Sequence, residues 1–167
     1  APSTCLWAAL EPATEDRPKR LHIYREVYDT RRGKTIQMTA ELIKDCSEGE
    51  EYVQTLLDPS CWNRDPAPDA VGGFFIVADE YARHGIYADR ANNEVEASVE
   101  RIWRYLGEPG QVPQLVIHRN CENLVRELRR QRWKSGINKL SLAIGLKMSD
   151  KIDNSDPDHA IDALRYI

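Results

Sequence analysis

Apolar and polar residues follow one another along this chain in patterns that predict both strands and helices. Thr4–Leu10 is a short, mostly apolar run, and Leu21–Tyr28 alternates apolar with polar residues, which is the period of a half-buried strand. A polar segment separates the two, so they predict a hairpin. Further strands are predicted at Tyr52–Leu57 and Leu115–His118.

Apolar residues at helical spacing predict helices among these strands. The predicted helices are Thr35–Cys46, Phe74–His84, Glu94–Leu106, Glu122–Trp133 and a short terminal helix that follows Asp156-Pro157. The proline-rich segment 65–69 is predicted to be a loop. Two strands at the start, followed by alternating helices and strands, indicate an α/β fold in which helices flank a mixed sheet. No internal repeat or change of composition divides residues 1–167, which we expect to form one domain.

Composition narrows the functional classes. No apolar run approaches the roughly 18 residues that a membrane helix needs, and the first residues lack the features of a signal peptide. The four cysteines are far apart and form no C-x-x-C pair, which predicts a reducing cytoplasmic setting with neither a zinc site nor a disulfide framework. A net charge of −4 argues against a protein that coats nucleic acid. It leaves room for a DNA enzyme that combines an acidic site with local basic residues.

Asp58 is the first candidate for chemistry. It stands where the apolar run before it ends at Pro59. In α/β sheets the ends of strands face the crevice where ligands bind, so a carboxylate here can hold a divalent metal. The alternative is a turn residue that caps the loop, because Asp-Pro commonly starts a turn.

A second group of acids lies in the terminal helix. Asp158 and Asp162 are four residues apart and share a helix face, where their like charges destabilise the helix unless a cation lies near them. Asp156 precedes Pro157 and is interpreted mainly as the helix cap. We therefore predict Asp158 as a metal ligand and Asp162 as an auxiliary one.

Basic residues gather on and after the predicted helix 122–133. Such residues can neutralise phosphates without reading bases. The alternative is a solvated surface whose charge Glu122 and Glu127 balance. The predicted DNA-binding residues are Arg126, Arg129, Arg130, Arg132 and Lys134.

Gly33-Lys34-Thr35 follows a strand and opens a helix, as a phosphate-binding loop does. The first glycine of that motif would fall on Tyr28, so no nucleotide site is predicted.

Several segments together resemble the C-terminal nuclease domain of phage terminase large subunits, in the order in which that family has them. The likeness covers nearly the whole chain. Its segments are Thr4–Leu10, Ile23–Glu26, Leu57–Ser60, Tyr81–Ile86, Asn120–Leu128 and Asp158–Tyr166.

The resemblance implies an RNase H-like fold and a metal-dependent endonuclease that cuts concatemeric viral DNA during packaging. It implies two ions, Mg²⁺ or Mn²⁺, of which one activates water and the other stabilises the leaving oxygen. Asp58 matches the family's second acidic ligand and Asp158 its third, while Asp162 corresponds to a supporting carboxylate. The implied partners are double-stranded DNA, the packaging ATPase domain, the small terminase subunit and the portal protein, in the cytoplasm of the host cell.

The family's first aspartate ends a strand that lies just upstream of Thr4–Leu10, between the hairpin and the strand that carries Asp58. Nothing precedes Ala1 here, so we expect an N-terminally truncated domain, without its ATPase half, that cleaves weakly or not at all. Glu26 offers no geometric reason to replace the missing acid. The alternatives are a resolvase of the RuvC type, a non-catalytic module that binds DNA or the portal, and a plain α/β scaffold with acidic caps.

Overall fold

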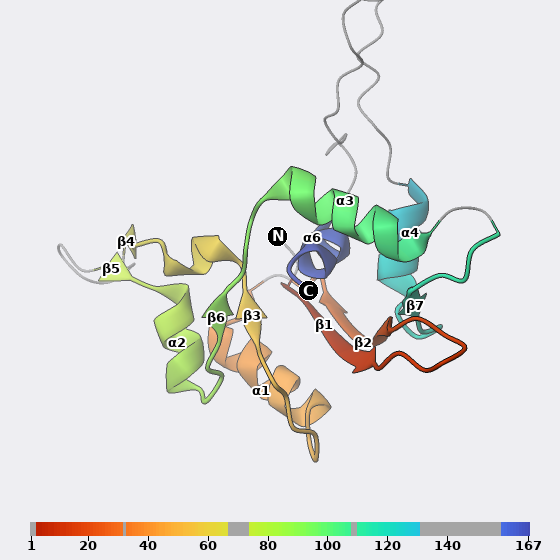
Figure 1. The fold of residues 1–167 in the computed structure, drawn as a ribbon. Helices are drawn as coiled ribbons and strands as arrows, with labels where there is room; N and C mark the ends of the chain where they lie inside the picture. The colour runs from red at the N-terminus through yellow and green to blue at the C-terminus, as the bar shows by residue number, and fades with distance from the viewer. Residues whose placement is uncertain (1–2, 32, 67–73, 108–109, 131–157) are drawn as a thin grey trace, which may run out of the picture.

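The computed structural model describes residues 3–31, 33–66, 74–107, 110–130 and 158–167 (Figure 1). Its first two strands form the predicted hairpin: β1 (Ser3–Glu11) pairs antiparallel with β2 (Arg20–Asp29), with one irregularity of register between Trp7 and Ala8. The short strand β7 (Leu115–Ile117) pairs with β2 in parallel. The result is a three-stranded mixed sheet in the order β1-β2-β7, with β1 at one edge.

The helix α1 (Ile36–Cys46) begins where the sequence predicts it. The Thr35 side chain accepts a hydrogen bond from the Met38 backbone N–H at 3.2 Å, which satisfies one of the free donors at the start of the helix. Gly33 has φ +76°, a conformation that glycine adopts without steric cost, and lies in the turn between β2 and α1. The Lys34 ammonium pairs with Asp29 at the end of β2.

The predictions for residues 52–84 are partly wrong. Of the predicted strand Tyr52–Leu57, only Leu56–Leu57 (β3) forms a strand, and it pairs in parallel with β6 (Asp89–Arg90). Tyr52 and Val53 are exposed and pair with no strand. A half-apolar run becomes a strand only where a partner strand pairs with it. The helix α2 (Val77–Arg83) starts three residues later than predicted.

Phe74–Phe75 instead forms the short strand β5, which pairs antiparallel with β4 (Asp65–Pro66) inside the segment predicted to be a loop. Aromatic residues favour strands, and this preference prevails over the helical spacing. The sheet of β1, β2 and β7 shares no strand pairing with β3–β6 within the described residues.

Three helices complete the fold. The helix α3 (Val95–Leu106) matches its prediction within one residue and ends at Gly107, which has φ +73°. The helix α4 (Glu122–Arg130) is described up to Arg130, and the rest of its predicted range lies outside the described residues. The terminal helix α6 (His159–Arg165) has Asp158 at its N-cap position without a capping side-chain hydrogen bond, and the predicted cap Asp156 lies outside the described residues.

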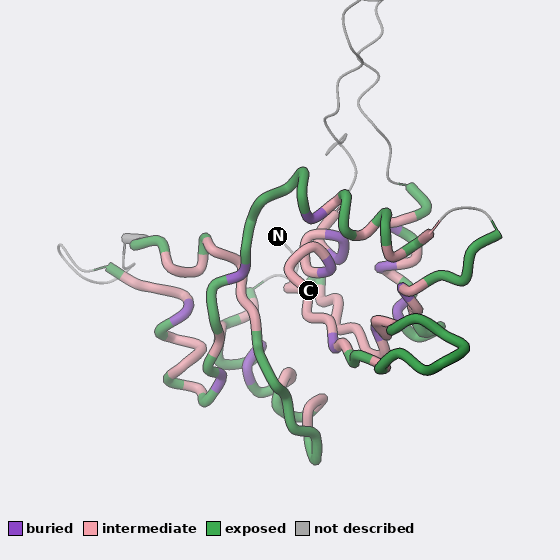
Figure 2. Tube along the Cα trace, viewed as in Figure 1, coloured by how far each residue is buried: buried purple, intermediate pink, exposed green. Residues whose placement is uncertain are grey.

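The core forms where α6 meets the sheet and α4 (Figures 1 and 2). Its buried residues come from β2, β7, α4 with the residue before it, and α6: Ile23, Leu115, Cys121, Leu124, Ala160, Ile161 and Leu164. The mixed α/β class predicted from the sequence is therefore confirmed. The four cysteines are free thiols. None of the helices in the described parts of the chain has the length and apolar character to cross a membrane.

Candidate functional site

Asp58 follows β3 directly and holds two elements together. Its Oδ1 accepts a hydrogen bond from the Ser60 backbone N–H at 2.7 Å and so caps the 3-10 helix η1 (Pro59–Trp62). Its Oδ2 accepts a hydrogen bond from the Tyr166 hydroxyl at the end of α6. The turn-capping interpretation of Asp58 is thus correct, and the same carboxylate also lies against the terminal helix.

The ionisation of Asp58 reflects this double contact. Burial raises its pKa, but the hydrogen bonds from Ser60 and Tyr166 and the charge of Arg165 outweigh burial and leave the pKa below the ordinary value for aspartate. Burial raises the pKa of Tyr166, and its hydrogen bond to Asp58 adds to the rise. Asp58 is therefore a carboxylate with both oxygens engaged by donors.

Asp162 lies in the same region and is paired with a cation. The Arg165 Nη1 donates to Asp162 Oδ1 at 2.6 Å, and its Nη2 donates to Asn93 Oδ1 at 3.0 Å. Burial raises the pKa of Asp162, Arg165 opposes the rise, and the negative charges of Asp158 and Asp58 add to it. The three predicted acids are thus close enough for their charges to interact.

These carboxylates do not form a complete metal site in the described residues. No group of three or more His, Cys, Asp or Glu side chains in these parts of the chain is arranged to hold a metal ion. Asp58 has both oxygens hydrogen-bonded, and the partner of Asp162 is Arg165, whose side chain is only 10% exposed. A divalent ion in this region would compete with Tyr166 and Arg165 for the same carboxylate oxygens.

His159 connects the start of α6 to the basic helix. The centroid of its ring lies 6.4 Å from the centroid of the Tyr28 ring on β2. The guanidinium of Arg126, on α4, lies 5.7 Å from the same Tyr28 centroid. Burial raises the pKa of Tyr28 to about 12, with a further contribution from Glu127. His159, next to Asp158, is therefore linked to Arg126 on the basic helix by the Tyr28 ring that lies between them.

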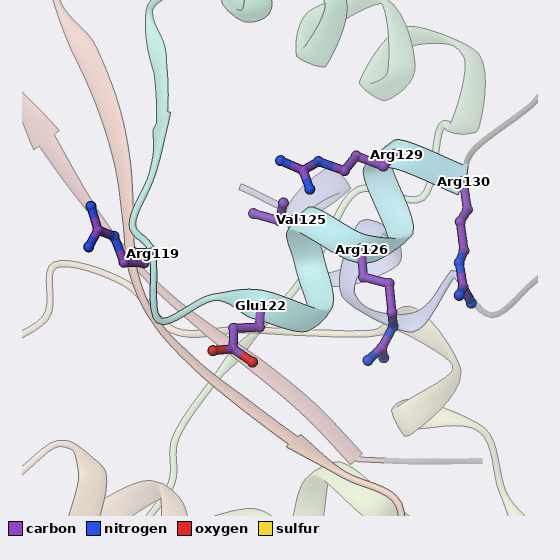
Figure 3. Close-up of a pocket in the computed structure, with 6 residues that line it drawn as sticks. All are labelled: Arg119, Glu122, Val125, Arg126, Arg129 and Arg130. Carbon is purple, nitrogen blue, oxygen red and sulfur yellow. The ribbon is translucent and has the colours of Figure 1, made fainter.

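The predicted arginines of α4 line a shallow groove of about 520 Å³ (Figure 3). The lining residues of α4 are spaced three, four, seven and eight positions from the first, so they occupy one helix face. Sequence reasoning missed Arg119, which lies in the turn before α4 and adds a fourth guanidinium. Arg132 and Lys134 lie outside the described residues. The groove is lined by Arg119, Glu122, Val125, Arg126, Arg129 and Arg130.

The interpretation of Glu122 and Glu127 as two solvated charges is half wrong. Glu122 is exposed, but Glu127 is 3% exposed and accepts hydrogen bonds from the backbone N–H groups of Ala160 and Ile161 at 2.7 and 3.2 Å. Glu127 lies on the buried side of α4 and binds the first turn of α6. Its carboxylate accepts hydrogen bonds from free N–H groups of α6 and so does not serve to neutralise the arginines of the basic surface.

Glu26 has a similar role at the start of α4. Its two oxygens accept hydrogen bonds from the backbone N–H groups of Asn123 and Leu124 at 3.0 and 2.7 Å, and Oε1 also accepts from the Asn123 side chain at 2.6 Å. This acid on β2 thus caps a helix.

The arrangement as a whole brings a strand-end aspartate, a helix-borne aspartate and an arginine surface onto neighbouring elements. Comparison of the chain with protein-family models, with curated proteins and with solved structures gives no match.

Proposed function

We propose that this chain is an RNase H-like nuclease domain of a DNA-packaging terminase large subunit, whose activity is metal-dependent cleavage of double-stranded DNA. The observation that carries the proposal is the hydrogen bond between Tyr166 and Asp58, which are 108 residues apart. It joins the end of β3 to α6, so that Asp58 lies near Asp162, the predicted auxiliary ligand. If Asp58 only capped the loop, its function would not depend on a second aspartate nearby, whereas a metal site requires several carboxylates close together.

The open edges of the two sheets support the same proposal. In the described residues β1 pairs only with β2, and β3 pairs only with β6. A central strand between β1 and β3 would join the two sheets into one. In the proposed fold a strand at this place supplies a further aspartate next to Asp58.

In the proposed site the aspartates bind the metal ions and the arginines bind the DNA backbone. When bound, Mg²⁺ or Mn²⁺ supplies the activation of water and the stabilisation of the leaving oxygen. Asp58, Asp158 and Asp162 provide the hard oxygen atoms that such ions prefer. Arg126, through Tyr28 and His159, connects the basic groove to the N-terminal end of α6, next to Asp158.

Plasmid nicking with Mn²⁺ tests the proposal. The chain is assayed as it stands and in a longer version that includes the residues encoded immediately upstream of Ala1. We expect cleavage mainly by the longer version, abolished by Asp58→Ala or Asp158→Ala and reduced less by Asp162→Ala. Asp79→Ala on α2 is the matched control because Asp79 is an exposed acid far along the chain from these residues. Normal cutting by Asp58→Ala would refute the assignment.

A non-catalytic nucleic-acid-binding module is the second candidate. It is favoured by one observation, namely that Tyr166 and Arg165 already satisfy the carboxylates while the arginine groove remains exposed. DNA binding by both versions without metal-dependent cutting by either would support this candidate over the nuclease.

A further inference from the structure

Three side chains with acid–base and metal-binding chemistry lie side by side on the three-stranded sheet, away from the carboxylates discussed above. Glu11 ends β1, His22 lies on β2, and His118 directly follows β7. Ile23 belongs to the core and Ile117 packs against it, so their neighbours His22 and His118 point to the opposite face of the sheet. Three adjacent strands thus present one titratable group each on the same face.

The contacts among the three fix the protonation of the central ring. His22 Nε2 lies 3.0 Å from Glu11 Oε2, and a carboxylate can only accept, so Nε2 carries the hydrogen and donates it. The hydrogen bond from His22 lowers the pKa of Glu11 below the ordinary value for glutamate. In neutral His22 the lone pair is then on Nδ1, which lies 3.3 Å from His118 Nε2.

This nitrogen–nitrogen distance is the one that a tetrahedral metal imposes on two of its ligands. Zn²⁺ binds imidazole nitrogen at about 2.0–2.1 Å, so two nitrogens of one tetrahedral site lie roughly 3.3–3.4 Å apart. Histidines that bind metal usually donate their other N–H to a carboxylate, which orients the ring and makes it a stronger ligand. Glu11 stands in that relation to His22.

We propose that His22 Nδ1 and His118 Nε2 form a surface site for Zn²⁺ or a similar borderline-soft divalent ion, with Glu11 as the residue that orients His22. Water completes the coordination, since no group of three protein ligands is arranged around an ion in the described residues. The ion would clip β7 to β2, two strands that are far apart in the sequence.

Backbone hydrogen bonds hold the segments that carry the two rings side by side before any ion binds. The His118 N–H donates to Ile23 O at 2.9 Å, and the Leu21 N–H donates to Gln114 O at 2.7 Å. These two hydrogen bonds fix the two ends of β7 to the residues that precede and follow His22 on β2. The rings themselves meet edge to face, at an interplanar angle of 74°. Because the His118 side chain is exposed, its ring can rotate until both lone pairs converge on one ion.

Isothermal titration of the chain with Zn²⁺, in excess Mg²⁺ to occupy the aspartates, tests the site. We expect one Zn²⁺ per chain, a rise in Tm on binding, and perturbed imidazole NMR signals of His22 and His118 alone. His22→Ala and His118→Ala should abolish this binding. Glu11→Gln should weaken it by about 10–100-fold, the usual effect of losing such a carboxylate. His84→Ala, whose ring also contacts a glutamate, is the matched control and should bind as the wild type does.

Unchanged Zn²⁺ binding in His118→Ala, or no binding by the wild-type chain, would overturn the proposal. A loss of Tm in His118→Ala that is the same with and without Zn²⁺ would also overturn it, because the two rings would then form only a hydrogen bond. None of these results depends on nuclease activity, so the site and the proposed function fail or succeed separately.

Discussion

Individual acidic residues of similar appearance in the sequence have opposite environments in the molecule. Glu122 and Glu127 stand on the same helix, yet only Glu127 is buried, where it accepts hydrogen bonds from the N–H groups of Ala160 and Ile161. A buried carboxylate is tolerated only where donors surround it. The position of Glu127 is therefore a condition for docking α6, and with it Asp162, against α4.

Glu127→Ala should destabilise the fold more than any exposed acid-to-alanine change. It leaves two backbone donors of α6 without their acceptor in a buried place, and each such loss costs on the order of 1–3 kcal/mol. We expect the free energy of unfolding in urea to fall by about 2–4 kcal/mol in total. Glu122→Ala, on the exposed face of the same helix, should change it by less than about 0.5 kcal/mol. Equal effects of the two changes would contradict this account.

The candidate site shows which residue-level features a sequence reveals. Asp58 is recognisable because an apolar run ends at an Asp-Pro pair, a signal within a few residues. Its contact with Tyr166, and that of Glu127 with the start of α6, join residues 108 and 33–34 positions apart, and no local spacing announces them. Arg119 was missed for a related reason, since only the folded turn brings it beside the α4 arginines.

At the scale of elements, a glutamate after α1 ties that helix to the sheet. Glu50 receives hydrogen bonds from Arg25 and Tyr24 on β2 and from Tyr52. Arg25 contributes most to lowering the pKa of Glu50 from 4.5 to about 2. An acid whose pKa is lower in the folded state stabilises the fold above its unfolded pKa, and this stabilisation disappears as the pH falls through the folded value.

Glu50→Gln should therefore be less stable than the wild type near neutral pH and approach it as the pH falls from about 4.5 toward 2. Thermal unfolding of both proteins across this range measures the difference. Arg25→Gln should remove the same pH-dependent difference, because Arg25 is its main cause. A gap between wild type and Glu50→Gln that does not depend on pH would show that the contact acts through packing alone.

The arginine face of α4 makes a different prediction. If it binds the DNA backbone, replacing Arg129 and Arg130 by alanine should weaken binding for all sequences and reduce the slope of log K against log salt by about 1 for each phosphate that the protein no longer neutralises. Fluorescence anisotropy with a duplex at several salt concentrations measures both effects. Arg83→Ala on α2, whose side chain is 73% exposed and outside the groove, is the control. An unchanged slope would show that these arginines are solvated and do not contact DNA phosphates.

For the whole molecule, the sequence is informative where elements are long and periodic. The hairpin, α1 and α3 were predicted nearly to the residue because each satisfies its own pattern through eight or more positions. β3 and β5 are two residues long, and their existence depends on β6 and β4, which offer no period to read. The division of the described strands into three separate sheets follows from such non-local pairings, so the mixed α/β class was predictable and the sheet pairing was not.

A change at Tyr166 tests how α6 is joined to the end of β3, because the Tyr166 hydroxyl donates a hydrogen bond to Asp58. Tyr166→Phe keeps the ring and removes the donor to Asp58. The free energy of unfolding should fall by about 1–3 kcal/mol, as for a hydrogen bond to a charged group. Affinity for Mn²⁺, measured by electron paramagnetic resonance, should rise, since one Asp58 oxygen becomes available to the ion.

The two measurements thus move in opposite directions in Tyr166→Phe, which separates this effect from general damage to the fold. Tyr87→Phe is the matched control because Tyr87 is 77% exposed, and it should leave both quantities unchanged. If stability and Mn²⁺ affinity fell together, Tyr166 would instead hold Asp58 in the position that a metal requires. If only stability fell, Asp58 would be a structural link between α6 and β3, and the acids would have to bind metal without it.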